Sequence, residues 1–421
     1  MGLSSSFLAK SPVLMIMSIA PAWLAGIALA VSFQPAVYKR IEKWRLPLAV
    51  GVYILTRFVL FYVIYIVLSD RKIGGDLLWY QWEGQGALAG KTPYTDFRCD
   101  HAPLFPYLMA VCYSIWSYTA SPVLLFILSD MLTLVLLCKI TRRLLGPEHV
   151  MNVAWIYVLN PAIWIITVRY GQDETVVSTF LLLAVYLYMT GSKWLNPFVL
   201  VLGTLITKYT TAIGMAAVYA YSKTKVRDAV VVLALAALVC VPFYLKGADL
   251  LDPIVKQGLS IEGVNVASVL GTLVVPQPYL PLLHHLASIA AVLAFGIVLY
   301  LGHRRGLPIA ATLTACLIVF LVFAPKSYKF YRLWFLGLLG MHAVQTHRIN
   351  RFVLYTTLLC TFDDFSFEPQ SPTAILYAMG ALAVAVLYFE TTYVFEILNR
   401  KLLKGRHSQA EPILPEQHPA A

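Results

Sequence analysis

The sequence predicts an all-α integral membrane protein, a multispanning bundle of about 11–13 helices with a long first external loop. Mean hydropathy is +0.73, and only 13% of the 421 residues are charged, about half the share expected of a soluble domain. Apolar runs of about 18 residues recur along the chain. Such runs must be helical, because hydrocarbon offers no partner for backbone polar groups.

The first apolar run, residues 12–33, allows two interpretations. Ala28-Leu29-Ala30 is similar to a signal-peptide cleavage site. The run is long, however, and four basic residues follow within 39–45. Because basic clusters remain in the cytoplasm, we expect residues 1–45 to form a retained extra membrane helix and a basic cytoplasmic linker.

Basic residues orient the rest of the chain. The run 46–68 leads outward, so the polar stretch 69–103 is predicted to be external. The same rule explains most of the net charge of +11, and the scattered positions argue against nucleic-acid binding. We expect a catalytic core at 46–346, C-terminal membrane helices at 347–400 and a disordered polar tail at 401–421.

Two segments do not fit simple spans. Residues 104–119 are too short for a comfortable crossing and are expected to be re-entrant or broken. Residues 196–222 are interrupted by Lys208, which would cost about 2.5–3.5 kcal/mol at the centre of a lipid-facing helix. We therefore expect two short helices with Lys208 near their outer turn.

The external loop contains the first candidate site residues. If its first part is helical, Asp76, Tyr80 and Glu83 lie on one face at i, i+4 and i+7. Carboxylates accept hydroxyl protons and aromatic faces stack on sugar rings, so this face suits a sugar site. A solvated amphipathic helix on the membrane surface is the alternative.

A second group of candidates is positively charged. Lys326, Lys329 and Arg332 fall on the outer side, against the topological preference for basic residues. An anionic ligand would explain them. By contrast, we expect Asp130 to be structural, and no Cys or His spacing predicts a disulfide framework or a metal site.

Several short motifs occur in a fixed order. Asp76 and Tyr80 precede Gly90-Lys91-Thr92-Pro93-Tyr94 and His101-Ala102-Pro103-Leu104, and later come Asn160-Pro161, Gly171-Gln172-Asp173-Glu174 and Lys208-Tyr209. Over residues 46–346 this order resembles the C-type membrane glycosyltransferases, in particular polyprenyl-phosphate-mannose-dependent mannosyltransferases. Members acting on GPI precursors carry Asp-x-Asp in the first loop, whereas Gly74 occupies the earlier position here, as in bacterial and archaeal relatives. The resemblance therefore leaves open whether a divalent cation takes part.

The resemblance implies an inverting transfer of a hexose, expected to be mannose, from a polyprenyl- or dolichyl-phosphate donor. The acceptor would be a lipid-linked glycan or other glycolipid at the external or lumenal face. Asp76 is the candidate general base. Substrate contacts are expected from Tyr80, Glu83, His101, Gln172, Glu174, Lys208, Lys326, Lys329 and Arg332, the basic ones meeting the leaving phosphate.

Two other function classes remain open. A transporter or flippase of lipid-linked sugars would also have many helices with ionisable residues, but such residues lie near the membrane midplane between inverted repeats. A non-catalytic subunit of the same family is the second alternative, against which the presence of Asp76 argues. We expect the cell membrane as the location, with the endoplasmic reticulum membrane as the alternative.

Overall fold

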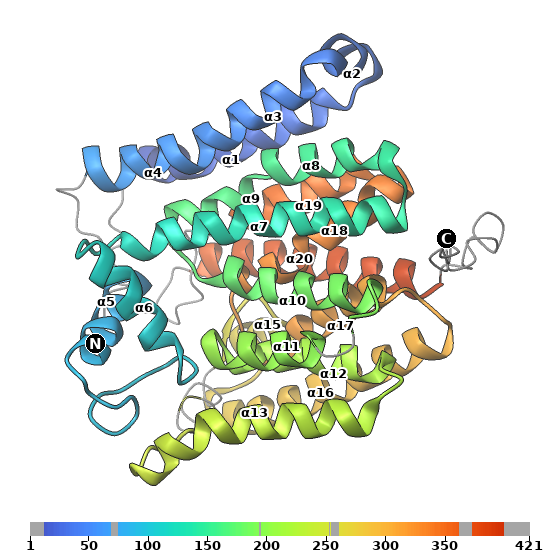
Figure 1. The fold of residues 1–421 in the computed structure, drawn as a ribbon. Coiled ribbons are helices and arrows are strands. Elements are labelled where there is room, and N and C mark those ends of the chain that lie inside the picture. Colours follow the sequence, from blue (N-terminus) through green and yellow to red (C-terminus); the bar gives the residue numbers. More distant parts are fainter. Residues whose placement is uncertain are drawn as a thin grey trace, which may run out of the picture.

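The computed structural model describes residues 12–68, 75–192, 195–251, 253, 261–361 and 373–399. Within these ranges the chain is almost entirely helical. Strand is limited to β1 (Glu262–Gly263) and β2 (Lys326–Ser327), which pair in parallel. Figure 1 shows the long helices lying side by side along a common direction. The prediction of an all-α fold is confirmed; the prediction for the tail 401–421 lies outside the described residues.

The helices follow one another with short connections. Their bounds are α1 (Pro12–Ser32), α2 (Pro35–Ile41), α3 (Arg45–Ile54), α4 (Leu60–Tyr62), α5 (Asp76–Leu88), α6 (Phe105–Ile115), α7 (Ser121–Leu144), α8 (Val150–Leu159), α9 (Pro161–Trp164), α10 (Glu174–Met189), α11 (Leu195–Ile206), α12 (Ala212–Tyr221), α13 (Lys225–Leu245), α15 (Val266–Leu273), α16 (Leu280–Arg304), α17 (Ile309–Phe323), α18 (Leu333–Thr346), α19 (Ile349–Thr361) and α20 (Thr373–Asn399). Two π-helical turns join α3 and α4 and extend them to Val67, so that Pro35–Val67 is one continuous helical segment.

Five described segments are long and apolar enough to cross a membrane. They are Pro35–Val67, Ser121–Leu144, Lys225–Leu245, Gln277–Arg304 and Gly380–Asn399. A sixth is formed if Pro147–Leu159 and Pro161–Arg169 are counted together, although they meet at 50°. The bend lies at Asn160-Pro161, where Pro161 cannot donate a backbone hydrogen bond and the Asn160 side chain instead accepts from the Ala162 N–H.

The number of full-length spans is smaller than the 11 that we expected. Several predicted spans form shorter apolar helices, namely Ala20–Ser32, Phe105–Ile115, Glu174–Met189, Leu195–Ile206 and Ile309–Phe323. Proline explains the bounds of α17, which begins directly after Pro308 and ends before Ala324-Pro325. The residue before a proline is driven out of the helical region, and Ala324 is extended at ψ 129°.

Both segments that we predicted to be irregular are interrupted. Residues 104–119 contain the 11-residue α6, which packs beside α5 across one end of the bundle (Figure 1). Residues 196–222 form α11 and α12, and the chain leaves the helix at Lys208 with φ −135° and ψ 141°. The predicted break at Lys208 is therefore present.

The two ends of the bundle differ in charge. Basic side chains occupy α2 and the last turns of α7 and α16, with Arg142, Arg143 and Arg304 among them. α5 and α6 lie at the opposite end (Figure 1). This separation places the acidic residues of the external loop far from the basic end.

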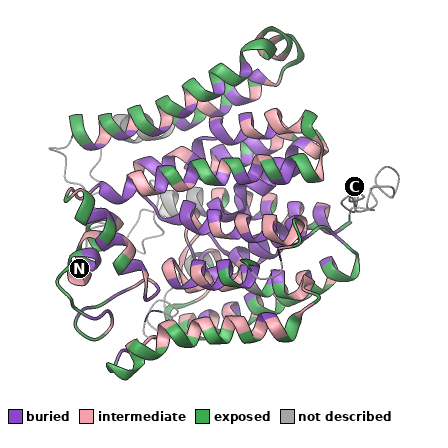
Figure 2. Ribbon diagram, viewed as in Figure 1, coloured by how far each residue is buried: buried purple, intermediate pink, exposed green. Residues whose placement is uncertain are grey.

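Burial and exposure also divide the helices. Figure 2 shows the inner helices mostly buried, whereas α3 and α13 carry long exposed faces. The exposed side chains of α13 are apolar, and Leu233 and Leu238 are 68% and 72% exposed. A contiguous apolar surface of this kind indicates contact with lipid or protein.

Asp130 has the structural role that we expected. Its carboxylate lies 3.0 Å from Arg57 Nε and accepts a hydrogen bond of 2.7 Å from Tyr157. Both charged groups are fully buried. The pair therefore joins the second predicted span to α7 and α8 inside the bundle, and neither Arg57 nor Asp130 reaches the site described below.

Candidate functional site

A cavity of about 800 Å³ lies at the α5 end of the bundle. Its walls come from α5, from the loops that precede α10 and α12, from α16, and from the segment after α17. Segments far apart in sequence thus contribute to one space. Seven of the ten residues that we predicted for the site line it: Asp76, Tyr80, His101, Gln172, Glu174, Lys208 and Lys326.

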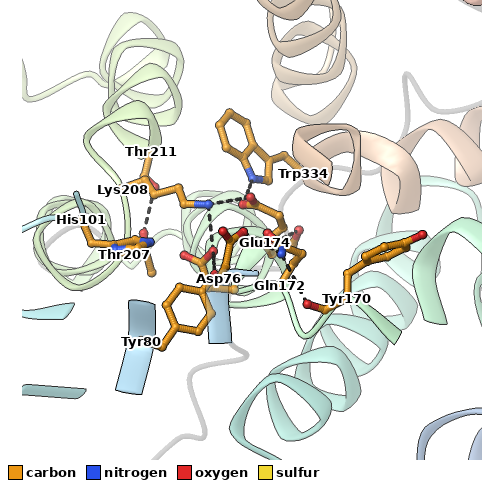
Figure 3. Close-up of polar contacts among 12 residues, drawn as sticks. Asp76, Tyr80, His101, Tyr170, Gln172, Glu174, Thr207, Lys208, Thr211 and Trp334 are labelled. Atoms are coloured by element: carbon orange, nitrogen blue, oxygen red, sulfur yellow. Dashed lines mark hydrogen bonds and ion pairs between the residues drawn. The ribbon is translucent and has the colours of Figure 1, made fainter. Parts of the chain in front are cut away.

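Asp76 is positioned by Gln172. Asp76 is the first residue of α5, and its Oδ2 accepts a hydrogen bond of 2.8 Å from Gln172 Nε2 (Figure 3). Gly171 makes the approach feasible: its φ is +58°, and a Cβ there would meet Leu77 of α5 at 3.0 Å. A side chain at this position would therefore push α5 away from the loop that carries Gln172.

The charged centre of the site is Lys208. Its Nζ lies 2.8 Å from Asp173 Oδ1 and 2.6 Å from Glu174 Oε1 (Figure 3). Both carboxylates are fully buried. Burial by itself would lower the pKa of the Lys208 ammonium, but the two carboxylates raise it well above its usual value. Lys208 is therefore a permanent cation.

Hydrogen bonds hold this centre from two sides. The Tyr80 hydroxyl donates to Asp173 Oδ1 at 3.1 Å, and Trp334 Nε1 donates to Glu174 Oε2 at 3.0 Å. The second oxygen of Asp173 is buried without a hydrogen-bond partner among the described residues. Because Lys208 already joins the two carboxylates, this arrangement does not offer them to a divalent cation.

His101 is oriented by Glu83. Its Nδ1 lies 3.0 Å from Glu83 Oε2, and the same carboxylate accepts the Asp100 backbone N–H at 3.0 Å. The imidazole also stacks on Phe105, with ring centroids 4.0 Å apart. Burial would lower the pKa of His101, but the Glu83 carboxylate outweighs that effect and raises it. Glu83 itself is fully buried and does not line the cavity.

The segment after His101 is attached to the end of α11. The Ala102 and Leu104 N–H groups donate to the carbonyls of Thr207 and Leu205, at 3.2 and 2.9 Å. These carbonyls lie where α11 ends and would otherwise lack helical partners. The break before Lys208 thus also places His101 near the lysine.

The three predicted external cations are separated. Lys326 lines the cavity, with its Nζ 3.8 Å from Glu262 Oε2. Lys329 does not line it; its Nζ lies 4.6 Å from the centre of the Tyr170 ring. Arg332 is fully buried away from the cavity. The expectation that they act together on one anion must therefore be revised, and only Lys326 faces the cavity.

Arg332 instead holds the Lys326 loop in place. Its Nε lies 2.9 Å from Glu390 Oε1, and both groups are fully buried. Its remaining donors reach the carbonyls of Val264, Ser327 and Tyr328 and the Ser327 hydroxyl. Since β1 and β2 contain or adjoin these acceptors, the guanidinium fixes both strands to α20.

We predict that Glu390→Ala lowers the free energy of unfolding by about 3–5 kcal/mol, because it leaves a buried guanidinium without its counter-ion. Thermal unfolding in detergent measures the effect. Glu396→Ala on the same helix is the matched control: Glu396 pairs with Arg348 and Arg351 but is partly exposed, so its loss should matter much less. Equal destabilisation by both variants would refute the role given to Arg332.

Sequence reasoning missed three residues of the site. Asp173 was not selected, although it lies between the candidates Gln172 and Glu174 at the start of a helix. Trp334 and Tyr331 had no recognisable signal. In the structure Tyr331 stacks on Trp334, with ring centroids 4.9 Å apart, and its ring lies 5.2 Å from Lys208 Nζ. These contacts join residues more than 100 positions apart.

No protein-family model, curated protein or solved structure matches this chain. Among the described residues, no group of three or more His, Cys, Asp or Glu side chains is arranged to hold a metal ion. The function is therefore argued from the geometry of the cavity.

Proposed function

We propose that this protein is a multispanning membrane glycosyltransferase that moves a hexose from a polyprenyl-phosphate donor to an acceptor hydroxyl. One observation carries the proposal: Asp76 shares a single cavity with the cation Lys326 and with apolar side chains of the helical bundle. The cavity lies opposite the basic end of the bundle. By the positive-inside rule, its location is the external or lumenal side.

The cavity has the two-sided chemistry that a lipid-linked sugar requires. Ile213, Ala291, Val292 and Phe320 form an apolar wall. Val292 is 66% exposed, so this wall continues onto the outer surface of α16. A polyprenyl chain would follow that surface, and the phosphate and sugar would lie among the polar residues. Aromatic rings for stacking on a sugar come from Trp79, Tyr209 and Tyr328.

Asp76 is the carboxylate best suited to accept a proton. Three acidic residues line the cavity, but Glu174 is paired with Lys208 and Asp100 with Arg98. Asp76 receives only the neutral Gln172 amide and has no cationic partner among the described residues. Its charge is thus not offset by a nearby cation, while the hydrogen bond fixes its orientation.

The chemical step is a displacement with inversion. The acceptor oxygen attacks the anomeric carbon and its proton moves to Asp76, while the bond from that carbon to the phosphate oxygen breaks. Polyprenyl phosphate leaves with the electron pair and gains negative charge. Lys326 is the cation placed to meet it, because its only nearby acid, Glu262, is 42% exposed. Lys208 is already offset by two carboxylates.

His101 is the second donor for the phosphate. Its Nδ1 is held by Glu83, so Nε2 is the nitrogen available to the cavity. The imidazolium donates from both nitrogens, and the raised pKa of His101 keeps that form populated to higher pH. The proposed contact is present below this pKa and is lost as the pH rises through it.

We predict that Glu83→Gln moves the alkaline limb of kcat/KM to lower pH, because burial still lowers the pKa of His101 while the opposing carboxylate is gone. The measurement is a pH–rate profile for both proteins. His101→Gln is the companion variant, in which this limb should disappear. An unchanged profile in Glu83→Gln would exclude His101 as the titrating donor.

The proposed activity is tested with purified protein, radiolabelled polyprenyl-phosphate mannose and a membrane glycolipid extract. We expect label to move to the acceptor with inverted anomeric configuration. Movement of intact donor across a vesicle membrane without transfer would indicate a flippase. Neither transfer nor movement, together with loss of a partner enzyme's activity in a deletion strain, would indicate a non-catalytic subunit.

A further inference from the structure

A second cavity, of about 720 Å³, lies at the basic end of the bundle. It is formed where α10 ends, α11 begins, α12 ends and α13 begins. None of its lining residues belongs to the first cavity. The proposed glycosyl transfer makes no use of it, so it requires a separate explanation.

The mouth of this cavity carries excess positive charge. Lys223 and Arg227 line it, and Lys225 lies between them in sequence, whereas Asp228 is the single acid of this segment. Asp228 is already engaged by Arg227 and by the Ser222 and Thr224 hydroxyls. Lys223 is exposed and has no acidic partner among the described residues. A ligand with a negative charge fits this mouth.

A buried amide marks the interior of the cavity. Asn196 lines it, is only 6% exposed, and its Oδ1 has no hydrogen-bond partner among the described residues. Leaving such an acceptor unsatisfied is unfavourable by about 1–3 kcal/mol. A ligand that donates a hydrogen bond, such as a hydroxyl, would satisfy the amide.

The rest of the lining is apolar and continues to the surface. Leu200, Val218, Val232 and Leu233 are among the lining residues. Leu233 is also 68% exposed, on the long exposed face of α13 in Figure 2. Hydrocarbon chains can therefore extend from the cavity onto this face without crossing a polar barrier.

We propose that this cavity binds one anionic phospholipid of the cytoplasmic leaflet whose headgroup carries hydroxyls. Its phosphate lies beside Lys223, a headgroup hydroxyl donates to Asn196, and the acyl chains cover the apolar side of α13. The lipid would connect α13, which has little contact of its own with the core (Figure 2), to α10 and α11. This site is independent of the proposed transferase activity.

The test uses the purified full-length protein in detergent, titrated with phosphatidylglycerol or with phosphatidylcholine. Native mass spectrometry counts bound lipids, and thermal unfolding measures stabilisation. We expect one phosphatidylglycerol to bind in preference to phosphatidylcholine. Lys223→Glu should weaken that binding about fivefold or more, because a lysine near an anionic headgroup contributes substantially to affinity. Soluble glycerol phosphate, which lacks acyl chains, should not stabilise the protein.

Two controls make the test specific. Lys225→Glu makes the same charge change two residues away, outside the cavity lining, and should leave binding close to that of the unaltered protein. Asn196→Ala should weaken phosphatidylglycerol but not phosphatidic acid, whose headgroup has no hydroxylated group beyond the phosphate. Equal effects of Lys223→Glu and Lys225→Glu, or equal affinity for phosphatidylcholine, would overturn the proposal.

Discussion

Asp76→Asn is expected to lower kcat by about 10²–10⁴-fold, the usual contribution of a general base. The substitution removes the proton acceptor but keeps the shape of the side chain. Its amide oxygen can still accept the hydrogen bond from Gln172 Nε2, so α5 should remain in place. The measurement is single-turnover transfer from a polyprenyl-phosphate sugar, which separates chemistry from binding.

Asp96→Asn is the matched control for Asp76→Asn. Asp96 belongs to the same external loop, does not line the cavity, and accepts the Thr92 backbone N–H, which asparagine can also do. Transfer should stay near that of the unaltered protein. If Asp76→Asn retained full activity while the protein was shown to be folded, another group would have to accept the proton.

Lys208→Met is expected to lower the free energy of unfolding by about 3–5 kcal/mol, the range found when one partner of a buried ion pair is removed. Methionine has a similar length, so packing changes little. The loss leaves Asp173 and Glu174 fully buried without their shared cation. Thermal and denaturant unfolding in detergent measure the effect, and transfer activity should disappear with it.

Neutralising the acids tests the cause of that loss. Adding Asp173→Asn and Glu174→Gln to Lys208→Met removes the uncompensated charges and should restore much of the stability, as a coupling energy between contacting residues. Lys326→Met is the control, because its only ion pair is partly exposed and should contribute about 1 kcal/mol or less. Lys326→Met should nevertheless impair transfer. Equal destabilisation by both lysine variants would contradict the charge argument.

Arg332 shows why sequence pattern alone misjudged the cations. Lys326, Lys329 and Arg332 lie within seven positions, and their charge and predicted side of the membrane are the same. What distinguishes them is a carboxylate on another helix: Glu390, 58 positions away, draws Arg332 into the core. Spacing along one segment carries no information about such a partner.

Glu83 shows the same limit within a helix. The spacing of Asp76, Tyr80 and Glu83 correctly indicated one helix, but not that its middle and last members would be buried. Glu83 faces His101, and Tyr80 faces Asp173. Each therefore positions another site residue, whereas Asp76 faces the cavity at the exposed first turn.

The amino-acid sequence by itself determined the all-α, apolar character of the chain and the interruption at Lys208. Both follow from local physics, since backbone groups in hydrocarbon must pair within a helix and a buried ammonium is unfavourable there. Only the tertiary structure decided which charges face the cavity and which are paired inside the protein. That choice depends on distances between helices, such as those that join Lys208 to Asp173 and Arg332 to Glu390.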